Sequence, residues 1–299
     1  MTCTPLGALT PYLNLCKPAA GEALWTAAIN GNWDLLDAAL QSLAGGPTIA
    51  NGGYGIRGLN GETTATGWSI SAPLIILWNP NTNVITVAKN VVGAGCDLTV
   101  SGTNGLDTGS FAANTWYHCY VMVNAAGAPS LSTISSLAAP PTGPAMPAGF
   151  TAWAYVGALR STTGPALIAT RMRGARFSYV VAPALVAAGA PAVGVEAAVS
   201  LATLIPPNAL VALLNTWFQV TGSVVSGFQY LLREVSGLTI STLRGLVQVA
   251  GQAGVVASDI ELANVGQNML YLWTIDAGAG SGPSANIFVK GYRVPNGDS

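Results

Sequence analysis

The stretch LIILWNPNTNVITVAK, residues Leu74–Lys89, decides the fold class, because it encodes two β-strands and the turn between them. An apolar run precedes Asn79-Pro80-Asn81, and a run rich in β-branched residues follows it. Asparagine and proline in this arrangement are typical of a tight turn between strands. The stretch therefore predicts an antiparallel β-hairpin.

Similar short runs, separated by glycine, proline and asparagine, continue from about residue 48 to the end of the chain. Thr115–Asn124 alternates bulky side chains as a sheet strand does, while 208–218 lacks strict alternation and is a strand or a helix. GCDLTVSG, residues 95–102, is also expected to be a strand. Strands of about 5–8 residues at this spacing indicate β-sandwiches or jelly rolls. We expect a mainly β protein with antiparallel β-sandwich (jelly-roll-like) modules at 47–185 and 186–299.

The composition favours a permanent assembly. Hydrophobic residues make up 51% of the 299 residues and charged residues only 8%, whereas soluble domains carry about 25% charged residues. The most apolar region, 178–218, offers no uninterrupted bilayer span of about 20 residues. We therefore expect no membrane insertion, and the N-terminus lacks the pattern of a signal peptide. An obligate homo-oligomer agrees best with so few charges. The interruptions of the apolar region are Pro183, Pro191, Glu196, Pro206 and Pro207.

The basic residues are too few to predict a nucleic-acid interface. The net charge is −1, and the densest basic cluster is RMRGAR, with Arg171, Arg173 and Arg176. A nucleic-acid footprint needs a larger patch. Alternation along a strand would place Arg171 and Arg173 on one face, which we interpret as a solvated face.

The cysteines suggest free thiols rather than a metal site. Cys3, Cys16, Cys96 and Cys119 form no CxxC pair, and His118 is the single histidine. A zinc site needs four such ligands at characteristic spacings. We expect buried, reduced thiols, as in a protein assembled in the cytoplasm, and no metal.

One string resembles a catalytic signature. GLDTGSF, residues 105–111, contains the Asp-Thr-Gly-Ser of aspartic proteases, which need two such aspartates. The chain has one copy, so we interpret Asp107 as closing a turn with its side chain. The glycine-rich GYGIRGLNG lacks the Lys-Ser/Thr of a phosphate loop.

The other titratable candidates are equally weak. His118 lies in an alternating strand and no GxSxG elbow accompanies it, so we interpret it as structural. Asp259 and Glu261 are two residues apart and would share one face of a strand. Paired carboxylates of this kind serve as the acid and base of a glycosidase or bind a cation, but more often they are simply exposed to solvent. We predict no enzyme activity and no cofactor.

The segment 21–40, GEALWTAAINGNWDLLDAAL, is amphipathic. Apolar positions recur at helical spacing, and Trp25 and Trp33 add two large rings. Gly31 weakens the interior, so one helix or two short helices meeting at this glycine are both compatible with the pattern. The rings need a surface to pack on, which is either the β-modules of the same chain or another protein. The apolar positions are Leu24, Ala28, Leu35, Leu36 and Ala39.

This segment resembles one found near the N-terminus of bacteriophage tail-fibre and other virion appendage proteins. The shared pattern covers about 30 residues: an Asn-Leu start, a Lys-Pro, an acidic residue, a tryptophan, an asparagine-rich helix and a Leu-Asp ending. Residues 105–161 and SANIFVKGYRVP, residues 284–295, are also similar to β-modules of phage fibre proteins. The matching N-terminal residues are Leu15, Lys17, Pro18, Gly21, Glu22, Trp25, Asn30, Asn32, Trp33, Leu36 and Asp37.

The resemblance implies a non-enzymatic structural protein of a phage virion, anchored by residues 1–46 and forming a homotrimer or another homo-oligomer. The chain has no coiled-coil or β-helical shaft, which favours a short fibre, spike or head fibre. Host-surface glycan is an implied partner. Two alternative functions are a carbohydrate-binding receptor module, in which exposed Trp and Tyr stack on sugars, and a glycan-cleaving appendage. The candidate residues for docking to other virion proteins are Trp25, Asn30, Asn32, Trp33, Leu36 and Asp37.

Overall fold

The structure, a computed structural model, describes ten ranges of the chain, and all their regular secondary structure is β-strand. The segment 21–40 with its six docking candidates lies outside these ranges, as do Cys3 and Cys16. No described segment forms a helix that could cross a membrane. The described residues are 55–82, 84–124, 131–186, 189, 192–222, 226–234, 239–247, 253–263, 267–277 and 280–296.

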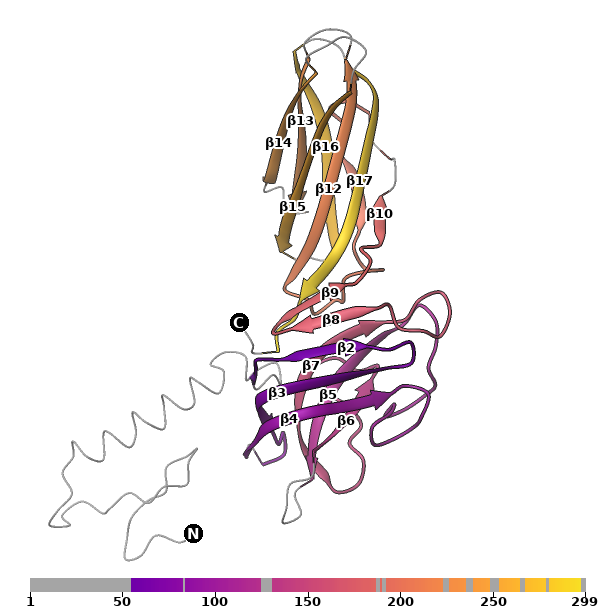
Figure 1. The fold of residues 1–299 in the computed structure, drawn as a ribbon, viewed down its shortest axis with the longest axis vertical. Coiled ribbons are helices and arrows are strands. Elements are labelled where there is room, and N and C mark those ends of the chain that lie inside the picture. Colours follow the sequence, from indigo (N-terminus) through magenta and orange to yellow (C-terminus); the bar gives the residue numbers. More distant parts are fainter. Residues whose placement is uncertain are drawn as a thin grey trace, which may run out of the picture.

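The strands form two lobes stacked end to end (Figure 1). The first lobe contains β1 (Ile56–Arg57), β2 (Asn60–Thr63), β3 (Gly67–Trp78), β4 (Ile85–Asp97), β5 (Trp116–Asn124), β6 (Leu131–Ser136), β7 (Phe150–Arg160), β8 (Thr170–Arg173) and β9 (Arg176–Tyr179). The second lobe contains β10 (Ala184–Val186), β11 (Ala197–Ser200), β12 (Val211–Gly222), β13 (Ser226–Glu234), β14 (Thr239–Val247), β15 (Ala253–Ala263), β16 (Asn268–Ala277) and β17 (Gly280–Arg293).

One large sheet runs through both lobes. Its hydrogen-bonded path is β15-β12-β17-β9-β8-β2-β3-β7-β5-β6, with β1 and β4 also on β3 and β10 also on β17. A second sheet, β11-β16-β13-β14, lies in the second lobe, and pairing between these strands is antiparallel throughout. The mainly β, antiparallel fold is as predicted. The division into modules at residue 185 stays a prediction. The large sheet crosses this boundary, since β10 pairs with β17.

The two sheets of the second lobe enclose an aromatic core. Phe218 of β12 stacks on Tyr230 of β13 with ring centroids 4.8 Å apart, and Trp273 of β16 lies 5.6 Å from Phe218. All three side chains are almost completely buried. Burial of such large apolar surfaces is the main favourable contribution to the stability of a sandwich of this kind.

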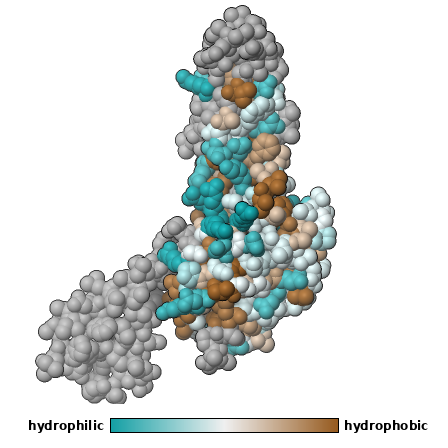
Figure 2. Space-filling model, in the orientation of Figure 1, coloured by the Kyte–Doolittle hydropathy of each residue, from teal (hydrophilic) through white to brown (hydrophobic). Residues whose placement is uncertain are grey.

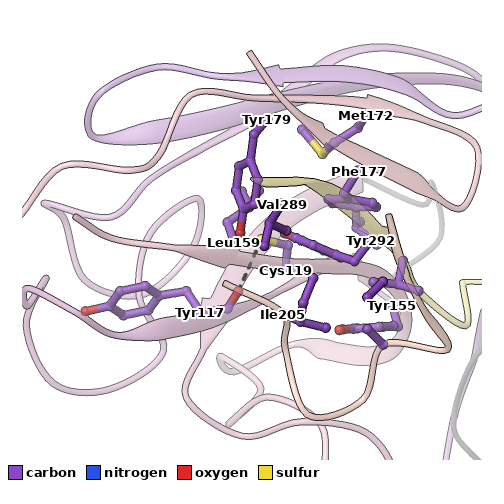
Figure 3. Packing of buried hydrophobic residues seen from close by; sticks show 14 of the residues in the cluster. Tyr117, Cys119, Tyr155, Leu159, Met172, Phe177, Tyr179, Ile205, Val289 and Tyr292 are labelled. Carbon is purple, nitrogen blue, oxygen red and sulfur yellow. Dashed lines mark hydrogen bonds between the residues drawn. The ribbon is translucent and has the colours of Figure 1, made fainter. Parts of the chain in front are cut away.

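The junction of the lobes is also packed with aromatic rings (Figure 3). Tyr292, near the end of β17, stacks on Phe177 of β9 at 5.5 Å and meets Tyr179 and Trp116 edge to face. The Tyr292 hydroxyl donates to the carbonyl of Ala158 in β7. The last strand of the chain therefore inserts its side chain into the core of the first lobe.

The last described residue, Asn296, packs into the first lobe. Asn296 is fully buried, and its amide donates to the carbonyls of Val156, 3.0 Å away, and Gly174, 3.1 Å away. Its own carbonyl accepts from the backbone N–H of Ile56 at 3.1 Å. The start of β1 and the residues after β17 thus meet at the side of the first lobe, beside the β8–β9 turn.

The hairpin predicted at residues 74–89 is confirmed as β3 and β4. Asn79 Oδ1 accepts from the backbone N–H groups of Asn81 and Thr82, and the Asn79 N–H donates to the carbonyl of Val84. Of the two alternatives for 208–218, the strand is correct, since β12 pairs with β15 and β17 along its length.

The strand predicted at residues 95–102 is partly wrong. β4 ends at Asp97, and a turn follows because the Asp97 carboxylate accepts from both the N–H and the hydroxyl of Thr99. An aspartate side chain that accepts a hydrogen bond from the backbone N–H two residues later favours a turn over continuation of the strand.

Candidate functional site

The outward face of the large sheet gathers charge in a chain that has little of it. We call this surface the charged face: the outward side chains of strands β15, β12, β17, β9, β8, β2 and β3. Figure 2 shows hydrophilic side chains collected over the second lobe and its junction with the first. Its five cations are among eleven Lys and Arg residues in the whole chain. The charged residues are Glu62, Arg171, Arg173, Arg176, Asp259, Glu261, Lys290 and Arg293.

Three arginines on this face stand directly opposite one another. In the strand register Arg173 of β8 pairs with Arg176 of β9, and Arg176 pairs with Arg293 of β17. Neighbouring strands lie about 4.8 Å apart. We call these residues the arginine row. Like charges directly opposite on adjacent strands destabilise a sheet, so the arrangement lowers stability unless other groups compensate.

Carboxylates compensate one end of the row. Arg293 Nη2 lies 2.9 Å from Glu261 Oε1, and Lys290 Nζ lies 2.8 Å from Asp259 Oδ2. The hydrogen bond from Lys290, with a second from Asn215, lowers the pKa of Asp259. Asp259 and Glu261 thus share one exposed strand face, as predicted. A lowered pKa is the opposite of what a general acid of a glycosidase needs.

The other end of the row has no ion pair with the described residues. The Arg173 guanidinium donates to Asn60 Oδ1 and to the Met172 carbonyl. Arg171 pairs in register with Glu62, but neither side chain makes a hydrogen bond or ion pair with any described residue. Both are exposed. They line a depression of about 250 Å³ together with Asn60, Ser69, Ser71 and Arg173.

A second depression, of about 270 Å³, lies on the same face around Arg176, Asp259, Glu261 and Lys290. Leu213 forms part of its floor and is only 3% exposed, although it points outward from β12. Long charged side chains cover apolar surface with their methylene groups, which explains this burial. Leu213 is therefore the residue that breaks the alternation of β12 and made a helix compatible with the sequence.

Asp107 belongs to a loop rather than to a paired catalytic centre. Its backbone N–H donates to the carbonyl of Ser135, and its Oδ2 accepts from the N–H of Ala145 at 2.9 Å. The predicted turn is corrected in one respect: the carboxylate connects two loops that are distant in sequence. Gly109 follows with a φ of +81°, which suits glycine.

His118 is buried inside β5. Its Nδ1 lies 3.1 Å from the Tyr155 hydroxyl, which accepts a hydrogen bond from Asn208 Nδ2 at 2.7 Å and can therefore donate its own proton to the imidazole. Burial lowers the pKa of His118 to about 4, because the charged form loses its hydration. The His118 side chain is therefore neutral in the folded protein at pH 7.

The two described cysteines are buried free thiols, as predicted. Cys96 Sγ donates to the carbonyl of Gly105 and lies 3.3 Å from Ser135 Oγ, which also accepts from the Trp68 indole N–H. Burial raises the pKa of the Cys96 thiol to about 11, and that of Cys119 is raised as well. High thiol pKa values disfavour the reactive thiolate.

Other surfaces offer less chemistry. In the described ranges, no three His, Cys, Asp or Glu side chains gather as a metal site would require. A larger depression of about 470 Å³ lies between β4 and the ends of β5 and β6, but Lys89 is its single charged lining residue. The described Trp and Tyr rings are buried or half-buried, so the exposed aromatic platforms assumed for sugar stacking are not found among them.

The sequence analysis named Arg171, Arg173, Arg176, Asp259 and Glu261, but it did not predict that the arginines and the two carboxylates lie on one face. Comparison with known proteins adds no assignment: no protein-family model matches the chain, and a search of curated proteins finds no significant match.

The buried imidazole makes stability fall in mild acid. The folded-state pKa of His118 is about 4 and its ordinary value is 6.5, so between these values the unfolded chain binds a proton that the folded chain does not. The contribution of neutral His118 to the free energy of unfolding is fully present above pH 6.5. It decreases as the pH falls toward 4, by about 3 kcal/mol in total. Urea unfolding of the protein and of His118→Asn, measured from pH 7 to pH 4.5, should show a shallower pH dependence for the variant.

Asparagine keeps a hydrogen-bonding group for Tyr155 but does not titrate. His118→Phe provides a second non-titrating side chain of different polarity and should show the same shallow profile. Equal pH dependence in wild type and both variants would show that His118 is accessible to protons in the folded state.

Proposed function

We propose that the chain is a non-enzymatic structural protein of a phage virion, a short fibre, spike or head fibre anchored by its N-terminal segment. The observation that carries the proposal is the elongated β-body with its two lobes. The chain enters the first lobe at Ile56, on the side of the lobe beside the β8–β9 turn, and the second lobe extends away from the first in long strands (Figure 1). An anchor at residues 1–46 would hold the first lobe at the particle and present the second lobe outward.

The resemblance of residues 15–37 to virion appendage proteins supports the same arrangement. In this proposal the residues 21–40 form a helical anchor, Trp25 and Trp33 insert into a neighbouring virion protein, and the two lobes act as β-sandwich modules. Large aromatic side chains commonly dominate the energetics of such interfaces. The competing interpretation is that the helix packs on its own β-module.

The described residues form an extensive apolar core. Most of their buried apolar side chains, from Ile56 to Val294, belong to one cluster that extends through both lobes. The β-body therefore has an apolar core of its own, as the anchor proposal requires.

Deletion of residues 1–45 tests the anchor. We expect the shortened protein to melt at the temperature of the full chain, because its core is intact, but to be missing from phage particles. Antibody labelling in electron micrographs of particles made with either form provides the measurement. Trp33→Ala in the full chain should reduce labelling less severely, since one ring is removed.

Two results would contradict the proposal. A large drop in melting temperature would show that the segment belongs to the fold, and normal labelling without residues 1–45 would place the attachment elsewhere. Absence of the full-length protein from particles would remove the virion role itself.

The surface of the described chain supports an oligomer. Val92 is 83% exposed and Val181 is 77% exposed, in a chain with 8% charged residues. Exposed apolar side chains of this kind are commonly covered by subunit contacts in permanent assemblies.

A homotrimer is the expected state. Light scattering of the purified full chain at micromolar concentration should give a mass of about 90 kDa, three times the 30.3 kDa of one chain. A monomer of 30.3 kDa that stays monomeric as the concentration rises would overturn this expectation.

A further inference from the structure

We propose that the arginine row and the depression beside it bind an anionic saccharide, a sugar unit that carries a carboxylate or a phosphate group. The anionic group would lie between Arg171 and Arg173, and the sugar hydroxyls would contact the neutral groups of the same depression. Nothing in the sequence pattern alone indicated such a site.

The first argument is electrostatic. Arg173, Arg176 and Arg293 are direct cross-strand neighbours, and such like-charge contacts are destabilising. The chain has few charges, so this concentration is not the consequence of a generally basic surface. A bound anion would relieve the repulsion, and guanidinium groups bind carboxylate and phosphate through paired hydrogen bonds.

The second argument concerns availability. Arg171 is exposed and makes no hydrogen bond or ion pair within the described ranges, so its donors are free for a ligand. Arg173 uses one nitrogen, Nη1, for Asn60 and the Met172 carbonyl, which orients its guanidinium at the edge of the depression. One arginine is therefore fixed and the other is free to adjust.

The third argument concerns the lining. Ser69, Ser71 and Asn60 offer two hydroxyls and an amide, and the free carboxylate of Glu62 accepts hydrogen bonds from hydroxyl groups. A ligand with several hydroxyls and one negative charge uses all of these groups. The volume of about 250 Å³ suits a single sugar unit rather than a large ligand.

A polyanion fits this face less well than a single anionic unit. Glu62 lies next to Arg171, and Asp259 and Glu261 neutralise the cations at the far end of the row. A nucleic-acid backbone carries a negative charge on every residue and would meet these carboxylates. The identification of the ligand with host-surface glycan rests on the proposed function, whereas the anion site rests on the geometry alone.

Isothermal titration of the purified full chain tests the proposal. The probes are galacturonic acid for the carboxylate, galactose 6-phosphate for the phosphate, and galactose as the uncharged sugar of the same size. We expect one or both anionic probes to bind and the uncharged probe not to bind. Affinity should fall as the salt concentration rises from about 0.05 M to about 0.5 M, since exposed charges are screened.

Three variants locate the binding. Arg171→Ala should weaken binding by about tenfold or more, and Arg171→Lys should restore part of it because the charge returns without the planar pair of donors. Arg244→Ala is the matched control, since Arg244 is also exposed but lies on β14 in the other sheet. Thermal melting confirms that each variant is folded.

The outcomes are decisive. No binding of either anionic probe, equal binding of the uncharged probe, or full binding by Arg171→Ala would overturn the proposal. Tighter binding of a dT10 oligonucleotide than of both saccharides would also overturn it in favour of a nucleic acid. Each of these results leaves the particle-labelling experiment unaffected, so failure of the site and failure of the virion role are distinguishable.

Discussion

The insertion of Tyr292 into the first lobe is the interaction on which the rest of the architecture depends. β17 starts in the second lobe, where it pairs with β12. Its last residues, Gly291–Arg293, also pair with β9 and so belong to the first lobe. The ring of Tyr292 is fully buried against Phe177 and Tyr179, and its hydroxyl is satisfied by Ala158. Apolar burial and a satisfied polar group together make this connection rigid rather than a linker.

The same connection creates the charged face. Arg173 and Arg176 belong to the β8–β9 hairpin, but Arg293 and Lys290 come from β17. Pairing of β9 with β17 sets these residues side by side, and a bulge between Leu213 and Leu214 of β12 accompanies the outward placement of Lys290. Without the pairing of β17 with β9, the cations would be divided between two separate surfaces. Fold and candidate site therefore share one structural cause.

The sequence predicted features whose causes are local. Asn79 makes the turn of the β3–β4 hairpin with its own side chain, so its chemistry is readable from the neighbouring residues. The strand content follows equally from short apolar runs and their separators. The termination of β4 by Asp97 was missed, because its capture of Thr99 competes with strand alternation in a way that composition does not show.

Features that depend on distant contacts were not predictable. Leu213 is buried on an outward face by charged side chains from other strands, which obscured the period of β12. Arg176 and Arg293 are separated by over a hundred residues in the chain and become neighbours through register alone. Asp107 likewise joins Ala145, which no local turn rule predicts.

Hydrogen exchange of the variant Tyr292→Ala tests the central connection most directly, with Tyr292→Phe as the control that removes the hydroxyl alone. If the crossing strand joins the lobes, Tyr292→Ala should reduce amide protection in β9 and β7 of the first lobe together with β12 and β17 of the second, and Tyr292→Phe should have a much smaller effect. Loss of protection confined to the end of β17, with β7 and β9 unchanged, would contradict the account.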